Sequence, residues 1–541
     1  MQFCSNYLNF FIFMKFTVLC AILSTCILFS CKEEKKKAVA TSEPITIAES
    51  VTQLYIDSSR IESFIVANKL TDSMANRLRQ FYTGRGYQYA WFNNDGLAEY
   101  TDAFYNMYVD YAAYAGDSAA VYKMLPAIYD SVVTAMAFNA KDTITSTAEL
   151  LLTLQFFRYA RRAYAGNPQL DAKELEWFIP RKKLNLPVLL DSMLAAKEKD
   201  ISAYEPVNRQ YHLLKEYLIK YYAIEKRGGW SPIVIATKKI EVGDTASGIA
   251  LVKQRLFLTG DLAAVDTSNE FNAALMLAIK NFQHRYGFNE DGKLSNSLLA
   301  EMNRPITERI QQLLINMERI RWVPATPTTD YLLVNIPEFK LHVYEKGQYA
   351  FNMNVVVGTA ANSTVIFNGN LKHVVFSPYW NVPPGILKNE VLPAIKRNSN
   401  YLAKHNMEWN GGAVRQMPGP KNSLGLVKFL FPNTYNIYLH DSPAKSLFEE
   451  SKRAFSHGCI RVAAPKKLAG FLLKPYPEWT DEKITAAMNK GKEQYVGLQK
   501  TVPVFIGYFT AWVDRDGKLN FRNDIYGHDK RMAQRLFSAA K

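Results

Sequence analysis

Cysteine, glycine and proline are all scarce in this sequence of 541 residues. It contains 5 Cys, 27 Gly and 23 Pro, whereas 48% of its residues are hydrophobic. So few cysteines over this length exclude a fold stapled by disulfides. The low glycine and proline content, with the high hydrophobic fraction, excludes a fibrous or disordered chain. At roughly 150 residues per domain, the length predicts about three folded domains.

The first 31 residues hold all the cysteines but one: Cys4, Cys20, Cys26 and Cys31. An uncharged apolar stretch from Phe16 to Ser30 follows Lys15 there. It is shorter than the roughly 20 residues that span a membrane, and it suits the apolar core of a secretory signal. Its end, Leu28-Phe29-Ser30-Cys31, resembles the lipobox of bacterial lipoproteins, in which the peptide is cut before a cysteine that is then lipidated.

We therefore expect residues 1–31 to be a lipoprotein-type signal peptide and residues 32–49 a solvated tether. The resemblance implies a lipid on Cys31 and an exported protein of the cell envelope, on the periplasmic face or the cell surface. An ordinary cleaved signal or an uncleaved anchor is the alternative, and Met14 is a second candidate start. In an oxidising compartment Cys459 has no partner except Cys31, so its thiol points to chemistry.

Residues 50–235 are rich in helix formers and aromatics, with apolar residues three and four apart, which predicts a helical scaffold domain. Its aromatic patch, Tyr87, Tyr89, Trp91 and Phe92, fits core packing better than sugar stacking. Residues 242–305 predict three short helices, the second beginning after Ser268 or Asn269. Ala278 to Phe288, with the following Asp291-Gly292, resembles a peptidoglycan-binding type 1 domain. A purely structural copy is the alternative.

A helix from Ile306 to Trp322 lies in a predicted linker, residues 306–328, before the pattern changes to the alternation of strands. Short strands separated by turns predict a β-sandwich or barrel-like catalytic domain over residues 329–541. An insertion at about 386–425 is a candidate lid. The chain is thus expected to be a multidomain α+β protein. The expected strands are 331–336, 340–344, 351–357, 371–376, 429–431 and 437–439.

Two short segments of this last domain carry the candidate catalytic groups. They are Ile437-Tyr438-Leu439-His440-Asp441-Ser442 and Phe455-Ser456-His457-Gly458-Cys459-Ile460-Arg461-Val462. A thiol at its ordinary pKa of about 8.5 is mostly protonated near neutral pH, so a nucleophilic cysteine benefits from a base such as His440. Gly458 allows close approach of the backbone, and the amides around Gly458 and Cys459 are candidate oxyanion donors.

These segments resemble the L,D-transpeptidases with a YkuD-type catalytic domain. The signature of that family is a His, about 15 residues, Ser/Thr-His-Gly-Cys, an apolar residue, and Arg or Asn. His440 and Ser456 to Arg461 match it at every position. Ser377 to Pro384 and the order of domains resemble the large YcbB-like branch. One departure is Ser363-Thr364-Val365, where many relatives have Thr-Pro.

The resemblance implies that Cys459 attacks a tetrapeptide stem of peptidoglycan to form a thioester. His440 would be the general acid and base, with His457 and Gly458 shaping the oxyanion region. The acceptor amine of a neighbouring stem would then give a 3-to-3 crosslink, and carbapenems would be inhibitors. Arg461 would orient a substrate carboxylate or act as a structural ion-pair partner. Further candidates for substrate binding are Ser456, Tyr438 and Trp380.

Other interpretations remain open from the sequence. Imidazole and thiolate suit zinc, but His440, His457 and Cys459 give only three ligands, and we expect no metal and no cofactor. L,D-carboxypeptidase activity, with water as acceptor, and a non-catalytic lipoprotein that tethers the wall are the alternatives. The net charge of +15 has no nucleic-acid-binding motif beside it, so anionic wall polymers and membrane surfaces are the expected partners.

Overall fold

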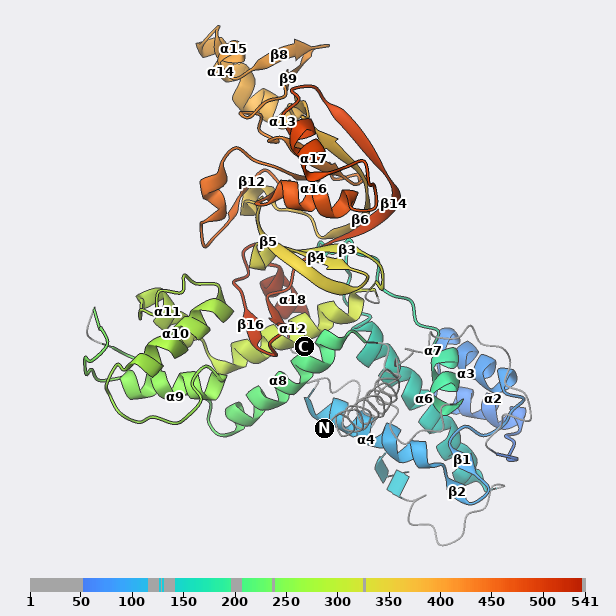
Figure 1. Ribbon diagram of the computed structural model, residues 1–541. Helices are drawn as coiled ribbons and strands as arrows, with labels where there is room; N and C mark the ends of the chain where they lie inside the picture. Colours follow the sequence, from blue (N-terminus) through green and yellow to red (C-terminus); the bar gives the residue numbers. More distant parts are fainter. Residues whose placement is uncertain are drawn as a thin grey trace, which may run out of the picture.

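The computed structural model describes residues 52–114, 126–127, 129–130, 142–195, 207–235, 239–324 and 327–537 (Figure 1). The predicted signal peptide, the tether and Cys31 lie outside these described residues. None of the helices in the described part of the chain is both long and apolar enough to span a membrane.

A helical scaffold forms the first part of the described chain, and its central helix α6 (Thr143–Ala165) is buried along most of its length. The buried Glu149 of α6 accepts hydrogen bonds from the amides of Ala90 and Trp91 and from the hydroxyl of Tyr82. Tyr89, Trp91 and Phe92 are buried, which confirms core packing for three of the four patch aromatics. The other elements are α2 (Ser58–Ala67), α3 (Asp72–Gly84), β1 (Phe92–Asn93), β2 (Gly96–Leu97), α4 (Glu99–Tyr114), α7 (Leu186–Ala195) and α8 (Arg209–Lys226).

Three helices follow where the sequence predicts them: α9 (Ile249–Thr259), α10 (Ala273–Tyr286) and α11 (Asn296–Met302). Helix α10 begins later than expected because the side chain of Asn272 caps it, accepting from the amide of Leu275 at 2.9 Å. Gln283 of α10 donates to Asp291 at 2.7 Å and accepts from the amide of Gly292 at 2.8 Å. The residues of the binding-module motif therefore hold this unit together, and its binding of peptidoglycan stays a prediction.

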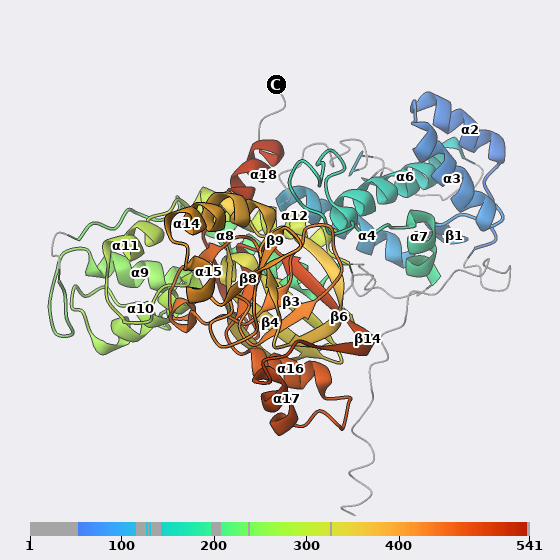
Figure 2. The ribbon, with the colours of Figure 1, turned by 90° about the horizontal axis from the view of Figure 1, so that it is seen from above.

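Helix α12 (Ile306–Trp322) has the bounds that the sequence predicts. It is buried on nearly all sides because it contacts α8 on one side and the C-terminal elements on the other. Those elements are β15 (Ala511–Val513), β16 (Leu519–Phe521) and α18 (His528–Leu536). Figures 1 and 2 show the two helical units on opposite sides of α12, and Figure 1 shows the strand-rich domain above α12.

The strand-rich domain is a nine-stranded sheet in the order β12-β5-β13-β11-β10-β6-β14-β3-β4. Because β4 also pairs with β5, the sheet closes on itself. The barrel-like alternative is therefore correct, and the β-sandwich expectation is not. Helices α16 (Pro465–Leu473) and α17 (Asp481–Met488) contribute to its core. The strands are β3 (Tyr331–Asn335), β4 (Lys340–Glu345), β5 (Gln348–Gly358), β6 (Phe367–Phe376), β10 (Val427–Leu430), β11 (Leu439–His440), β12 (Ala454–Ser456), β13 (Ile460–Val462) and β14 (Gln494–Gly507).

The insertion at residues 386–425 is a small subdomain at the end of the barrel farthest from the helical units (Figure 1). It has its own apolar core of Val382, Val391, Met407 and Val414. Strand β7 (Trp380–Asn381) pairs with β9 in a separate three-stranded sheet, in the order β7-β9-β8. Its remaining elements are α13 (Pro384–Ile386), a π-helical turn (Leu387–Val391), α14 (Leu392–Arg397), α15 (Tyr401–Lys404), β8 (Met407–Asn410) and β9 (Ala413–Gln416).

A segment of the scaffold, residues 170–179, is built into the core of the barrel domain. Leu170, Trp177 and Ile179 are buried in that core. The amide of Phe178 donates to the carbonyl of Ile366 at 2.9 Å, beside a parallel bridge between Trp177 and Ile366. The scaffold and the barrel domain are therefore joined by shared packing as well as by the chain.

Candidate active site

The short parallel pair of β11 and β13 brings the two sequence segments of interest together. Leu439 pairs with Ile460, and His440 pairs with Arg461. Leu439 and Ile460 are fully buried in the barrel core. Because side chains alternate along a strand, His440 and Arg461 project from the opposite face, together with Tyr438 and Cys459 just before the two strands. Four of the predicted site residues therefore share one face.

The thiol of Cys459 is half-buried, and its Sγ donates a hydrogen bond to the carbonyl of Asn436 at 3.5 Å. Burial raises the pKa of this thiol, while hydrogen bonds from the main chain and hydroxyl of Tyr438 and the charge of Arg461 oppose the rise. Burial, and then the nearby thiol of Cys459, raise the pKa of Tyr438 well above its usual value. A thiol with a raised pKa remains protonated near neutral pH, so it needs a base to react.

His440 is buried, and its Nδ1 lies 2.5 Å from the carbonyl oxygen of Asp441. A carbonyl only accepts hydrogen bonds, so Nδ1 carries the proton, and the neutral ring keeps Nε2 as its basic atom. Burial, and then the charge of Arg461, lower the pKa of His440 to about 4. The imidazole is therefore neutral near pH 7 and able to accept a proton.

In this conformation the thiol is oriented toward Asn436, and no hydrogen bond joins His440 to Cys459 among the described residues. The ring of Tyr438 lies 5.7 Å from the ring of His440 and contacts the thiol. Hydrogen bonds of catalytic groups are often long before substrate binds and tighten with it. The arrangement thus places a neutral base and a protonated thiol on one surface, with a cation beside both.

Asp441 is a further site residue, which the sequence signalled only by its position next to His440. Its buried carboxylate accepts from the amides of Leu426 at 2.9 Å and Ser442 at 2.7 Å, and it also pairs with Lys445. These contacts fix the main chain of Asp441, and its carbonyl in turn orients the ring of His440.

Ser456 and Gly458 do not have the roles that the sequence suggests. The hydroxyl of Ser456 is buried and donates to the carbonyl of Cys459 at 2.6 Å, while the amide of Gly458 donates to that hydroxyl at 3.2 Å. Ser456 therefore braces the loop instead of facing a substrate, and the Gly458 amide is not an open oxyanion donor. Gly458 has φ +113°, a conformation that glycine alone adopts easily. The amide of Cys459 is the candidate donor that remains.

The other predicted residues lie around this centre. The exposed His457 points to the insertion, where its Nε2 lies 3.3 Å from Oε1 of Glu390. Trp380 lies in β7 and packs against the core of the insertion. Nε of Arg461 is buried without a hydrogen-bond partner among the described residues, and burial lowers the pKa of this guanidinium.

Within the described part of the chain, no three His, Cys, Asp or Glu side chains gather into a group that could hold a metal ion.

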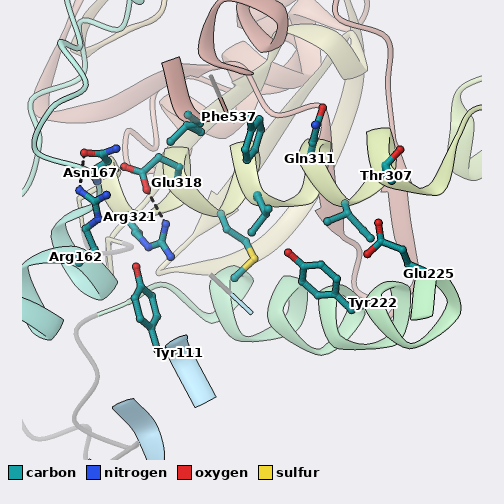
Figure 3. Close-up of a pocket in the computed structure, with 14 residues that line it drawn as sticks. Tyr111, Arg162, Asn167, Tyr222, Glu225, Thr307, Gln311, Glu318, Arg321 and Phe537 are labelled. Atoms are coloured by element: carbon teal, nitrogen blue, oxygen red, sulfur yellow. Dashed lines mark hydrogen bonds and ion pairs between the residues drawn. The ribbon is translucent and has the colours of Figure 1, made fainter. Parts of the chain in front are cut away.

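A separate cavity of about 340 Å³ lies between α8, α12 and the C-terminal end of α18 (Figure 3). Its polar lining includes the ion pair of Arg321 with Glu318 at 2.6 Å and the hydrogen bond from Arg162 to Asn167 at 2.7 Å. None of the predicted catalytic residues lines it. The cavity belongs to the junction of the scaffold with α12 and is distinct from the face that carries Cys459.

Two family models match parts of this chain. Residues 329–506 match the family model of the L,D-transpeptidase catalytic domain, YkuD, and residues 76–218 match a scaffold domain. A Haemophilus influenzae protein named "Putative L,D-transpeptidase" is 32% identical over 243 residues, which are 41% of this chain and 49% of that protein. The chain thus spans about half the length of this curated relative.

Solved structures with similarity to this chain include two L,D-transpeptidases. The one from Xylanimonas cellulosilytica is 14% identical and covers 50% of this chain and 98% of its own, with a TM-score of 0.18. The one from Stackebrandtia nassauensis is also 14% identical and covers 50% of this chain and 97% of its own, with a TM-score of 0.22.

Proposed function

The chain contains a YkuD-type L,D-transpeptidase catalytic domain and a scaffold domain, and we propose that it forms 3-to-3 crosslinks in peptidoglycan through a thioester on Cys459. One observation supports this above all. The pairing of β11 with β13 puts Cys459 and His440 on the same face, where the thiol is protonated and the imidazole is neutral. These are the protonation states from which a base-assisted attack begins.

In the first step His440 takes the thiol proton, and Sγ of Cys459 attacks the carbonyl of the third, L-centred residue of a donor tetrapeptide stem. The C–S bond forms and the C–N bond to the terminal D-alanine breaks. His440 returns its proton to the leaving amine, so that charge balances. The amide of Cys459 stabilises the oxyanion of the tetrahedral intermediate.

In the second step a side-chain amine of a neighbouring stem attacks the thioester. The new C–N bond forms, the C–S bond breaks, and the proton lost by the amine passes through His440 to the thiolate. The guanidinium of Arg461 stabilises the thiolate each time it forms, because its charge acts against the effect of burial on the thiol.

The rest of the proposal concerns location. The lipobox-like end of the N-terminal apolar stretch supports an exported protein with a lipid on Cys31. The motif at Ala278 to Phe288 supports binding of peptidoglycan by residues 242–305. Together they would hold the catalytic domain between membrane and wall.

The test is to incubate the purified protein with a disaccharide-tetrapeptide and to analyse the products by mass spectrometry. A 3-to-3 dimer with release of D-alanine is the expected result. Tripeptide without dimer would show an L,D-carboxypeptidase, in which water replaces the acceptor amine. No turnover by folded protein would favour a tether that is not catalytic.

Two variants and one inhibitor test the proposed roles of Cys459 and His440. Cys459→Ala should form neither dimer nor acyl-enzyme, and a dimer made by this variant would contradict the proposed nucleophile. His440→Gln should slow acylation by about 100- to 10,000-fold while leaving the fold intact. Imipenem should add its mass to the wild-type protein and not to Cys459→Ala.

A further inference from the structure

The loop that carries Cys459 is held from behind by a residue outside the His and Cys motif. The hydroxyl of Thr364 donates to the carbonyl of Gly458 at 2.8 Å and accepts from the amide of Gly358 at 2.9 Å. Thr364 is buried, with 1% of its surface exposed. It lies between β5 and β6.

The carbonyl of Gly458 and the amide of Cys459 belong to the same peptide unit. A trans peptide is planar, so its N–H points opposite to its C=O. Because Thr364 holds the carbonyl toward the buried side of the loop, the amide of Cys459 is directed away from that side. Gly458, at φ +113°, has the backbone freedom to let this peptide rotate if the carbonyl is released.

Thr364 is fixed in turn by the C-terminal segment. The hydroxyl of Tyr526 donates to the carbonyl of Gly358 at 2.6 Å and accepts from the amide of Thr364 at 3.3 Å. Tyr526 lies beyond residues 329–506, which match the catalytic domain. The hydroxyls of Thr364 and Tyr526 thus connect the main chain of Gly358 to the peptide unit before the thiol.

Residues 176–178 of the scaffold contact residues close in sequence to Thr364, Tyr526 and Asn436. Ile366, two residues after Thr364, accepts from the amide of Phe178. Glu176 pairs with Arg531 at 2.6 Å, close in sequence to Tyr526. The ring of Phe178 also lies 5.5 Å from that of Tyr435, next to the carbonyl of Asn436 that holds the thiol.

We propose that Thr364 and Tyr526 are positioning residues that set the direction of the Cys459 amide toward the oxyanion, and that the scaffold and the C-terminal segment support them. This inference rests on the proposed function, since it concerns the oxyanion of acyl transfer. Thr364 and Tyr526 both lie outside the His and Cys motif, and their hydrogen bonds would act on catalysis through the Cys459 amide.

The experiment compares two reactions of the Cys459 thiol in the full chain, acylation by imipenem and alkylation by iodoacetamide. Acylation by imipenem develops an oxyanion, whereas alkylation by iodoacetamide does not and needs only the thiol and its base. Thr364→Val should slow acylation by about 10- to 100-fold. Alkylation should stay close to that of the wild type, while the melting temperature should fall by a few degrees because two buried main-chain groups lose their partner. Thr364→Ser should restore acylation.

The matched control is Thr359→Val, because the hydroxyl of Thr359 caps the neighbouring turn and not the catalytic loop. It should leave both reactions unchanged. Tyr526→Phe keeps the hydroxyl of Thr364 and should slow acylation in the same direction but less. If Thr364→Val does not fold, the rate of acylation of Tyr526→Phe tests the inference in its place.

Unchanged acylation in folded Thr364→Val, or an equal loss of acylation and alkylation, would overturn the inference. Unchanged acylation in Tyr526→Phe would do so as well. A wild-type protein that is alkylated at Cys459 but never acylated would instead reject the proposed function.

Discussion

Nε2 of His457 lies 3.3 Å from Oε1 of Glu390, and this contact joins the loop before Cys459 to the inserted subdomain. Both side chains are more than half exposed, at 54% and 57%. Ion pairs at such sites contribute about 0–1 kcal/mol. This contact therefore adds little to the stability of the fold, and the role of the insertion as a lid stays a prediction.

Removing the charge of Glu390 should affect substrate entry and leave stability nearly unchanged. We expect Glu390→Gln to alter KM by about fivefold at most, with kcat and the melting temperature near those of the wild type. Steady-state kinetics measure the effect, and a large loss of kcat would show instead that Glu390 serves the chemistry.

Arg461 should control the pH range of acylation. The pKa of His440 is lowered to about 4, so the rate should fall on the acid side only as pH approaches 4. Arg461→Gln removes a positive charge that disfavours the charged imidazole, so the pKa of His440 rises and the acid limb moves to higher pH. The same change raises the pKa of the thiol, so alkylation at pH 7 should slow.

Arg461→Lys keeps the charge and serves as the control for the pH profile. Its acid limb should stay near that of the wild type. If both variants shift equally, the shape of the guanidinium and not its charge sets the profile.

Gly425 should be essential because of its contact with Asp441. It has φ +63°, and a Cβ there would lie 2.4 Å from the Asp441 side chain. Gly425→Ala should displace Asp441 and with it His440, lowering acylation by about tenfold or more. Gly412 also has a positive φ, but a Cβ there meets nothing within 4 Å. Gly412→Ala should therefore cost only about 1–2 kcal/mol of backbone strain and keep its activity.

Trp177 tests whether the scaffold segment stabilises the barrel domain. It is 2% exposed, and its ring lies 5.7 Å from that of Trp322 and 6.0 Å from that of Phe509. Trp177→Ala should cost about 3–5 kcal/mol and lower the melting temperature of the barrel domain by about 10 °C. Trp409→Ala, at 53% exposure on the insertion, is the matched control and should change it little. If Trp177→Ala changes the melting temperature as little as Trp409→Ala does, the scaffold and the barrel domain unfold independently.

The strands and the linker helix were predictable because their apolar residues repeat at strand or helix spacing. Helix α12 has the predicted bounds, and β3 and β4 differ from prediction by one residue at an end. Strand β14 was missed because much of it is exposed and it contains Gly497 and Pro503, which weaken a strand pattern. Strands β12 and β13 are three residues each, too short to show a period.

Some residues of the candidate site were also predictable from the sequence, and others were not. The spacing of His440 and Cys459 predicted that they act together as base and thiol, and the structure places both on one face. The roles of Asp441, Thr364 and Tyr526 were not predictable, since their hydrogen bonds join residues whose proximity the chain order does not show. For the same reason the sequence placed the Gly458 amide at the oxyanion, whereas Ser456 engages it.

By itself, then, the sequence determined the residue types that can do the chemistry, the helical and strand-rich regions, and an N-terminal stretch with the character of a signal. Only the tertiary structure decided which side chains share a face, which amide remains open, and that the scaffold packs into the barrel core beside the catalytic loop. The physical reason is that period and composition are local properties of a chain. The direction of a peptide unit and the pKa of a buried group depend on atoms brought together from distant parts of it.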